Sequence, residues 1–170
     1  MAPTPVCSPT KEMQREYPDF PVSPAGRNSR RTASALPNSS ASPLLLFDTH
    51  ALLWWLTDDP KLSHRAREVT ADEANPILVS AASAWKIATK FRLGKFDLAA
   101  DAVSRFAELI AADGFEHLPV TYLHALKAAG YELDYRDLFG RMLAAQSALE
   151  SASLITCNAA FEAFGAEVLW

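Results

Sequence analysis

Oxygen-bearing side chains follow the apolar segments of this chain at the points where strands of a folded sheet would end. Asp48 comes directly after the wholly apolar run Leu44–Phe47, and Asn158 follows another apolar run near the end of the chain. Ser80 closes a third run, and a turn at Asp137–Arg141 precedes a long helical pattern. Carboxylate and carbonyl oxygens are the ligands that hard divalent cations prefer. Asp48 is therefore a candidate ligand for a metal ion.

Short apolar runs alternate with helical patterns, which predicts a parallel sheet covered by helices. We expect strands at Leu44–Phe47, Ile77–Ser80, Phe115–Leu118, Ser153–Cys157 and Glu167–Trp170. We expect helices at about Ala51–Leu56, Ser63–Ala74, Ala81–Phe91, Ala99–Ala112, Thr121–Ala129 and Leu138–Glu150, with a short helix near Ala160–Phe164. The expected fold class is α/β, a three-layer α/β/α domain with a central, mostly parallel sheet. Ligands of such sheets bind beyond the carboxyl ends of the strands, where Asp48 would lie.

The first 42 residues differ from the rest in composition. Eight of the 11 prolines fall in Met1–Pro43, together with many Ser and Arg residues and few large aliphatic ones. Such a segment buries too little apolar surface to offset the entropy lost on ordering. We therefore predict a disordered Ser/Pro/Arg-rich leader over residues 1–42 and a single domain over residues 43–170.

The charge of the predicted domain argues against a simple DNA-binding module. After Ser42 the chain carries 11 basic and 17 acidic residues, so it lacks the broad positive surface that drives nucleic-acid binding. Cys7 and Cys157 have no metal-ligand spacing, which favours a reduced intracellular protein. No apolar run approaches the ~20 residues of a membrane span. We expect a cytoplasmic protein without a membrane segment.

Five segments stand in a fixed order along the domain: LLLFDTHALLWWL (Leu44–Leu56), LVSAASAWKIATKFRLGK (Leu78–Lys95), YRDLFGRMLAAQSALE (Tyr135–Glu150), LITCNAAFEAFG (Leu154–Gly165) and the terminal VLW. Together they resemble the PIN-domain family, in particular the VapC-type toxins of prokaryotic toxin–antitoxin pairs. The resemblance implies a metal-dependent endoribonuclease in which acidic side chains hold Mg²⁺ or Mn²⁺. Such ions lower the pKa of an attacking water and stabilise charge developing on the phosphate.

The chain departs from that family at three of the four positions where the resemblance places acids. Asp48 keeps the first acid. Lys86 stands where a SAWEIA-type helix motif has Glu, Gly140 where a DPFDR-type turn has its second Asp, and Asn158 where a T-x-D motif has Asp. Glu to Lys changes the local charge by two units, and one unit-charge contact at about 4 Å is worth ~1–4 kcal/mol. We expect much weakened metal affinity and lost or residual hydrolysis.

Each of these residues also has an ordinary structural interpretation. Asp48 could cap the first helix. Lys86 could be a solvated helix residue, an ion-pair partner of Asp48 or a contact for RNA phosphate. Asp137 could be a surrogate metal ligand or cap the long helix, and Asn158 could be a weak carbonyl ligand or a helix N-cap. Arg141 could contact a phosphate or a carboxylate, or lie on the surface.

The aromatic and histidine side chains carry less information. The tryptophans on apolar helix patterns favour a core or partner-interface role over base stacking; they are Trp54, Trp55 and Trp85. The four histidines show no ligand spacing, so we assign them no metal role; they are His50, His64, His117 and His124.

Two functional hypotheses follow. The first is a VapC-like toxin whose endoribonuclease activity is impaired. The second is a non-catalytic binding protein that keeps the PIN fold and dimerises or binds an antitoxin. The resemblance implies a VapB-like antitoxin and a second copy of the chain as partners, and RNA as substrate if the protein is active. Combining Lys86→Glu, Gly140→Asp and Asn158→Asp is expected to recover Mg²⁺ binding.

Overall fold

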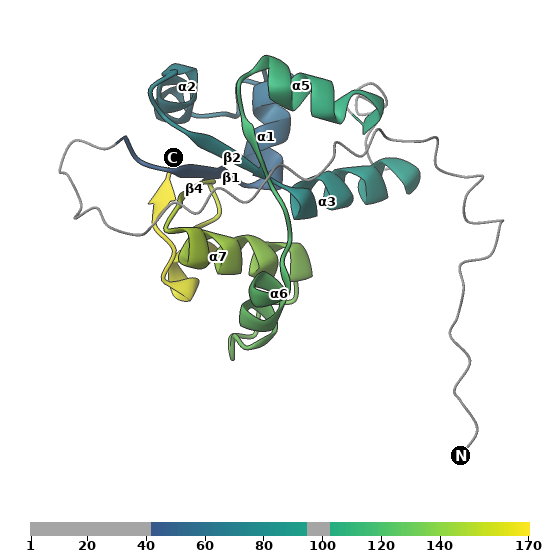
Figure 1. Ribbon diagram of the computed structural model, residues 1–170, viewed down its shortest axis with the longest axis vertical. Helices are drawn as coiled ribbons and strands as arrows, with labels where there is room; N and C mark the ends of the chain where they lie inside the picture. The colour runs from purple at the N-terminus through teal and green to yellow at the C-terminus, as the bar shows by residue number, and fades with distance from the viewer. Residues whose placement is uncertain (1–41, 95–102) are drawn as a thin grey trace, which may run out of the picture. The chain divides into compact units, whose positions relative to one another are not determined.

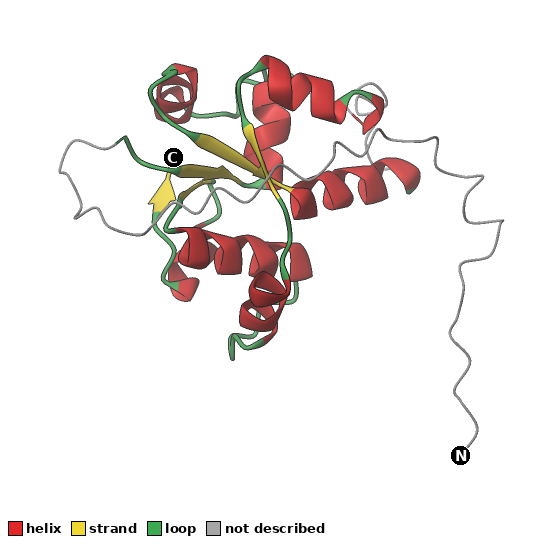
Figure 2. Cartoon of the chain, viewed as in Figure 1, coloured by secondary structure: helices red, strands yellow, loops and turns green. Residues whose placement is uncertain are grey.

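Five parallel strands form the centre of the computed structural model, which describes residues 42–94 and 103–170 (Figure 1, Figure 2). They are β1 (Leu45–Phe47), β2 (Ile77–Ser80), β3 (Glu116–Leu118), β4 (Ser153–Ile155) and β5 (Val168–Leu169). Their order in the sheet is β3-β2-β1-β4-β5, and every neighbouring pair is parallel. In the central strand, Leu45 lies opposite Ile77 on one side and Ser153 on the other. The predicted three-layer α/β/α class is confirmed.

The apolar run that begins the domain is buried on both faces of the sheet. Leu45, Leu46 and Phe47 have no exposed surface. Because successive side chains of a strand point to opposite faces, Leu45 and Phe47 join one hydrophobic core and Leu46 joins the other. This double burial explains why the strand is continuously apolar rather than alternating. It also fixes the carboxyl end of β1, and therefore Asp48, at the edge where the strands end.

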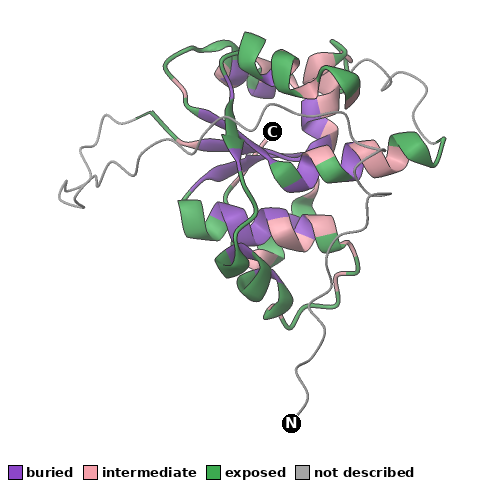
Figure 3. Ribbon diagram, turned by 45° about the vertical axis from the view of Figure 1, so that its right-hand side comes forward, coloured by how far each residue is buried: buried purple, intermediate pink, exposed green. Residues whose placement is uncertain are grey.

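Helices cover both faces of the sheet (Figure 1, Figure 3). The core on one face includes side chains of α1 (Thr49–Leu56), α2 (His64–Ala71) and α5 (Phe106–Ala112). The core on the other face includes side chains of α7 (Leu138–Glu150) and the 3-10 helix η1 (Ala159–Phe164), and α6 (Tyr122–Ala129) packs against α7. Helix α3 (Ala81–Arg92) starts directly after β2 and contacts both α1 and α7. It thus joins the two helical layers at the carboxyl edge of the sheet.

Hydroxyl side chains set the starts of several helices, as their sequence positions predict. Ser63 accepts a hydrogen bond from the backbone N–H of Ala66, and Ser80 accepts one from that of Ala82. Thr121 and His124 form a reciprocal capping box in which each side chain accepts from the backbone N–H of the other. Each bond satisfies an N–H group that has no partner within its helix.

Element boundaries differ from the predicted ones by a few residues. Helix α2 ends at Ala71 rather than near Ala74, because Asp72 adopts an extended conformation and its carboxylate accepts from the N–H of Ala74. The predicted helix at Ala99–Ala112 is described only from residue 103, and α5 occupies Phe106–Ala112. The predicted leader over residues 1–42 lies outside the described residues apart from Ser42. Among the helices that the structure describes, none has the length and apolar character needed to cross a membrane.

Candidate functional site

Asp48 lies where β1 ends, and its side chain turns toward β4. The residue is 5% exposed, and its Oδ2 atom accepts a hydrogen bond of 3.1 Å from the buried hydroxyl of Thr156. His50 Nδ1 lies 3.9 Å from the same oxygen. Asp48 occupies the N-cap position of α1, but its side chain makes no capping hydrogen bond. The carboxylate is therefore held at the carboxyl edge of the sheet and does not cap α1.

Lys86 reaches the same edge from α3 and is buried there. It is 8% exposed, and its ammonium nitrogen lies 2.6 Å from Oδ2 of Asp137. The same nitrogen lies 5.6 Å from the centroid of the Phe139 ring, within the range of a cation–π contact. The interpretations of Lys86 as a solvated residue and as the partner of Asp48 are both wrong, because its partner is the carboxylate of Asp137.

Asp137 uses both of its carboxylate oxygens within the protein. Oδ1 accepts from the backbone N–H of Phe139 at 3.0 Å and so caps α7, while Oδ2 accepts from Lys86. Burial raises the pKa of this carboxyl, but the hydrogen bond and charge of Lys86, together with the backbone N–H groups of Gly140 and Phe139, outweigh burial and hold the pKa below its ordinary value. The predicted capping role of Asp137 is confirmed, and its charge is matched by an internal cation.

Asn158 is also bound at both ends of its side chain. Its Oδ1 accepts from the N–H of Ala160 and caps η1, which confirms the capping interpretation. Its Nδ2 donates to the hydroxyl of Tyr135 at 3.1 Å, and its backbone N–H donates to Thr156 Oγ1. Since Thr156 also donates to Asp48, these contacts form one chain of hydrogen bonds from Asp48 to Tyr135.

Gly140 lies buried in the first turn of α7, beneath the ring of Tyr135. A Cβ atom added at Gly140 would lie 2.5 Å from Cε1 and 2.7 Å from the hydroxyl oxygen of Tyr135. Burial raises the pKa of the Tyr135 phenol, the hydrogen bond from Asn158 lowers it, and the charges of Asp137 and Asp48 raise it further. Tyr135 is thus the residue of this site that sequence reasoning missed, although it stands two positions before Asp137.

Arg141 secures the loop that leads to Tyr135. Its guanidinium donates to the backbone carbonyl oxygens of Ala128, Tyr131, Leu133 and Tyr135. A single guanidinium therefore fixes the end of α6 and the segment before α7. The structure gives Arg141 backbone carbonyl partners instead of the carboxylate that was one interpretation of it, and contact with a phosphate stays a prediction.

Residues 45–167 match the family model for the PIN domain. The chain belongs to the PIN-domain family. Two solved structures have a similar fold. One is the crystal structure of VapBC2 from Rickettsia felis bound to a DNA fragment from their promoter, with a TM-score of 0.53, 15% identity, and coverage of 74% of this chain and 97% of that one. The other is a toxin–antitoxin complex from Klebsiella pneumoniae, with a TM-score of 0.50, 20% identity, and coverage of 74% and 96%. No curated protein matches the sequence.

PIN domains are generally divalent-metal-dependent nucleases, and the donor set of this PIN domain does not fit such an ion. Asp48 offers one carboxylate, while the carboxylate of Asp137 is bound to Lys86 and the Oδ1 atom of Asn158 is bound to Ala160. Over residues 42–94 and 103–170, no three side chains of Asp, Glu, His or Cys gather in a group that could hold a metal ion. Mg²⁺ and Mn²⁺ require several oxygen ligands, and a buried ammonium competes with them for the same carboxylate.

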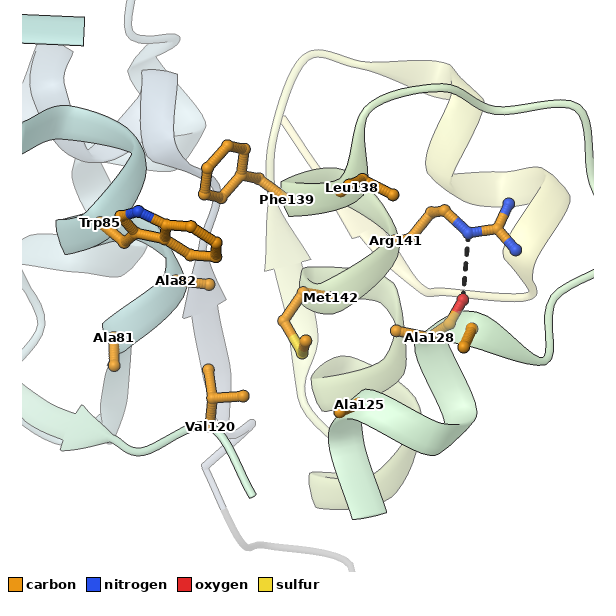
Figure 4. A pocket seen from close by; sticks show the side chains of 11 residues that line it. Ala81, Ala82, Trp85, Val120, Ala125, Ala128, Leu138, Phe139, Arg141 and Met142 are labelled. Atoms are coloured by element: carbon orange, nitrogen blue, oxygen red, sulfur yellow. Dashed lines mark hydrogen bonds between the residues drawn. The ribbon is translucent and has the colours of Figure 1, made fainter. Parts of the chain in front are cut away.

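An apolar groove of ≈ 650 Å³ lies between α3 and the α6–α7 pair of this PIN domain (Figure 4). Trp85 and Leu138, at opposite sides of the groove, are 68% and 75% exposed, whereas Ala82 and Ala128 are buried in its walls. Arg141 is the charged residue among those that line it, and its guanidinium is bound to backbone carbonyls. The lining is therefore apolar apart from this one guanidinium. The partner-interface interpretation of Trp85 agrees with this exposure.

Proposed function

We propose that this PIN domain is a VapC-like protein in which ribonuclease activity is lost or residual, and which acts by binding other proteins in the cytoplasm. The observation that carries the proposal is the 2.6 Å contact between Lys86 Nζ and Asp137 Oδ2. An ammonium group is already bound to a carboxylate at the edge of the sheet where the family resemblance places the metal. One of the two acids at this edge is therefore already bound to a cation of the chain itself.

Electrostatics explains why this contact opposes metal-dependent hydrolysis. A divalent cation placed near Asp48 and Asp137 would meet the positive charge of Lys86 at close range. At about 4 Å, one unit-charge repulsion costs ~1–4 kcal/mol for effective dielectrics between those of water and a protein surface, and a divalent ion doubles the charge. The remaining acid, Asp48, is a single carboxylate. One carboxylate does not replace the several that would be needed to hold the ion.

The proposed partner is a VapB-like antitoxin. Support comes from the two structures with a similar fold, which are those of VapBC2 and of a toxin–antitoxin complex. An antitoxin that inserted a basic side chain at the edge of the sheet would be repelled by Lys86. Binding through apolar contacts away from Lys86 avoids this repulsion. Co-expression with the product of the adjacent gene, followed by size-exclusion chromatography, tests the partnership, and separate elution of the two proteins would contradict it.

A second copy of this chain is the proposed occupant of the apolar groove. The same surface carries projecting side chains, Trp85 and Leu138, and a hollow bounded by alanines. In a two-fold dimer the same patch of both copies forms the interface. The projecting side chains of one copy can therefore enter the hollow of the other. Apart from Arg141, whose guanidinium is bound to backbone carbonyls, the lining is uncharged, so the pairing of two identical surfaces is mainly apolar.

The alternative, an active endoribonuclease, is separated from this proposal by an activity test. Purified protein is incubated with structured RNA in the presence of Mg²⁺ or Mn²⁺, beside an Asp48→Ala variant that controls for contaminating nuclease. We expect at most trace cleavage by the natural sequence. Multiple-turnover cleavage that Asp48→Ala abolishes would overturn the proposal and establish the chain as an active ribonuclease.

A further inference from the structure

Two of the three replaced acid positions contact one side chain, that of Tyr135. The ring of Tyr135 lies over Gly140, at a distance that leaves no room for a Cβ atom there. Gly140 lies within helix α7 and has no positive φ, so space rather than backbone conformation accounts for the glycine. The hydroxyl of Tyr135 accepts from Nδ2 of Asn158. The ring therefore occupies the volume that a side chain at position 140 would fill.

Tyr135 is held in this place from three directions. Asn158 binds its hydroxyl, and because Oδ1 of Asn158 accepts from Ala160, the amide is oriented with Nδ2 toward the tyrosine. The ring packs edge-to-face on Phe164, with centroids 5.2 Å apart. Arg141 donates to its carbonyl oxygen. The residue is therefore held by contacts of its backbone carbonyl, its aromatic ring and its hydroxyl.

Lys86 is a second obstacle to a cation at this site. Its ammonium nitrogen lies 2.6 Å from Oδ2 of Asp137. Tyr135 therefore contributes a neutral ring over position 140, and Lys86 contributes a positive charge beside Asp137.

We infer that Tyr135 closes the metal position of this PIN domain, so that restoring the acids does not restore metal binding while the tyrosine is present. This rests on the proposed function, which assigns positions 86, 140 and 158 as former acid positions. The triple variant Lys86→Glu/Gly140→Asp/Asn158→Asp, expected from the sequence to recover Mg²⁺ binding, should therefore fail to do so. An aspartate at position 140 needs the space that the ring of Tyr135 fills.

The test measures Mn²⁺ binding by calorimetry in three variants that all carry the three restored acids. The first keeps Tyr135, the second adds Tyr135→Ala, and the third adds Tyr135→Phe, which removes the hydroxyl and keeps the ring. We expect the Tyr135→Ala protein to bind Mn²⁺ at least tenfold more tightly than the other two. Equal affinity in the first and second variants, or no binding by a folded Tyr135→Ala variant, would overturn the inference.

A second measurement needs none of the acids. Gly140→Ala is made in the natural sequence and in a Tyr135→Ala background, and thermal unfolding is followed by circular dichroism. Alanine is favoured over glycine within a helix, so the substitution should raise the Tm when Tyr135 is absent and lower it when Tyr135 is present. A rise of equal size in both backgrounds would refute the contact. Mn²⁺ uptake by the natural sequence would instead contradict the proposed function. That outcome differs from the one that would refute the contact between Tyr135 and Gly140.

Discussion

The ammonium nitrogen of Lys86 lies 2.6 Å from Oδ2 of Asp137, and the two residues are 51 positions apart in the chain. The lysine comes from α3 and the aspartate caps α7, so their contact joins the two helices beyond the end of the sheet. Lys86 is buried, whereas the side chain of Asp137 is about one-third exposed. The pair therefore differs from an exposed ion pair, since removing the acid would leave a buried ammonium without its partner.

Asp137→Asn tests the contribution of this contact to stability. Asparagine remains a good N-cap, so the variant keeps the cap of α7 and loses the charge that Lys86 binds. We expect the free energy of unfolding to fall by about 1.5–3 kcal/mol, the range for a hydrogen bond to a charged group. Asp137→Ala removes the cap as well and should cost about 1 kcal/mol more. Urea unfolding monitored by tryptophan fluorescence measures both losses, and an unchanged midpoint for Asp137→Asn would contradict the role of the pair.

The same contact predicts a dependence of stability on pH. Burial raises the pKa of the Asp137 carboxyl, but Lys86 and the backbone N–H groups of Gly140 and Phe139 outweigh burial, so the folded pKa lies below the ordinary value of 3.8. A carboxyl with a lower pKa in the folded state stabilises the fold fully above its unfolded pKa and loses this contribution as the pH falls through its folded pKa. The gap in unfolding free energy between the natural protein and Asp137→Asn should therefore be constant near neutral pH and shrink below 3.8.

A matched variant tests whether the change in stability at low pH comes from the carboxyl of Asp137. Asp134 is an exposed residue on the loop before Asp137. Asp134→Asn removes a carboxylate without touching the Lys86 contact. Urea midpoints at a series of pH values then compare both variants with the natural protein. A gap for Asp137→Asn that stays constant to the lowest pH would show that the ion pair does not depress the pKa of Asp137.

Thr156 supplies the next prediction, because its buried hydroxyl donates to Asp48 and accepts from the N–H of Asn158. Thr156→Val keeps the shape of the side chain and leaves the buried carboxylate of Asp48 without this donor. We expect a loss of about 1–3 kcal/mol in unfolding free energy, the cost of leaving a buried polar group unsatisfied. Thr156→Ser keeps the hydroxyl and should lose much less. Equal losses in both variants would point to packing of the methyl group instead.

The elements that carry these residues could be predicted because their signals are local. The run Leu44–Phe47 is apolar throughout, and its strand residues Leu45–Phe47 are buried on both faces. The caps Ser63 and Thr121 stand directly before their helices. The position of Asp48 follows from the end of β1 alone. Such features depend on neighbouring residues and on the period of the pattern.

The contacts within the candidate site could not be predicted in the same way. Lys86 was expected beside Asp48 or in solvent, yet it binds Asp137, since α3 leaves the sheet toward the start of α7. Arg141 binds backbone carbonyls, a role that no sequence pattern marks. Tyr135 gave no signal of its own. The glycine at position 140 was the available signal, because a glycine within a helix often marks the close approach of another group.

The groove between α3 and the α6–α7 pair carries the last prediction, which concerns assembly. Leu138 is three-quarters exposed at the edge of the groove and is the first residue of α7. Glutamate is favoured in the first turn of a helix, so Leu138→Glu should leave the monomer folded. In a dimer that buries this groove, the variant would place two carboxylates in an apolar interface, which is costly for unpaired charges.

We expect sedimentation velocity to give a dimer for the natural protein and a monomer for Leu138→Glu, with the dissociation constant raised at least tenfold. Leu149→Glu is the matched control, because Leu149 is an exposed leucine on the same helix that does not line the groove. The control should remain dimeric. Dissociation by both variants would indicate a general effect of added charge, and a Leu138→Glu protein that stays dimeric would show that copies of the chain pair through another surface.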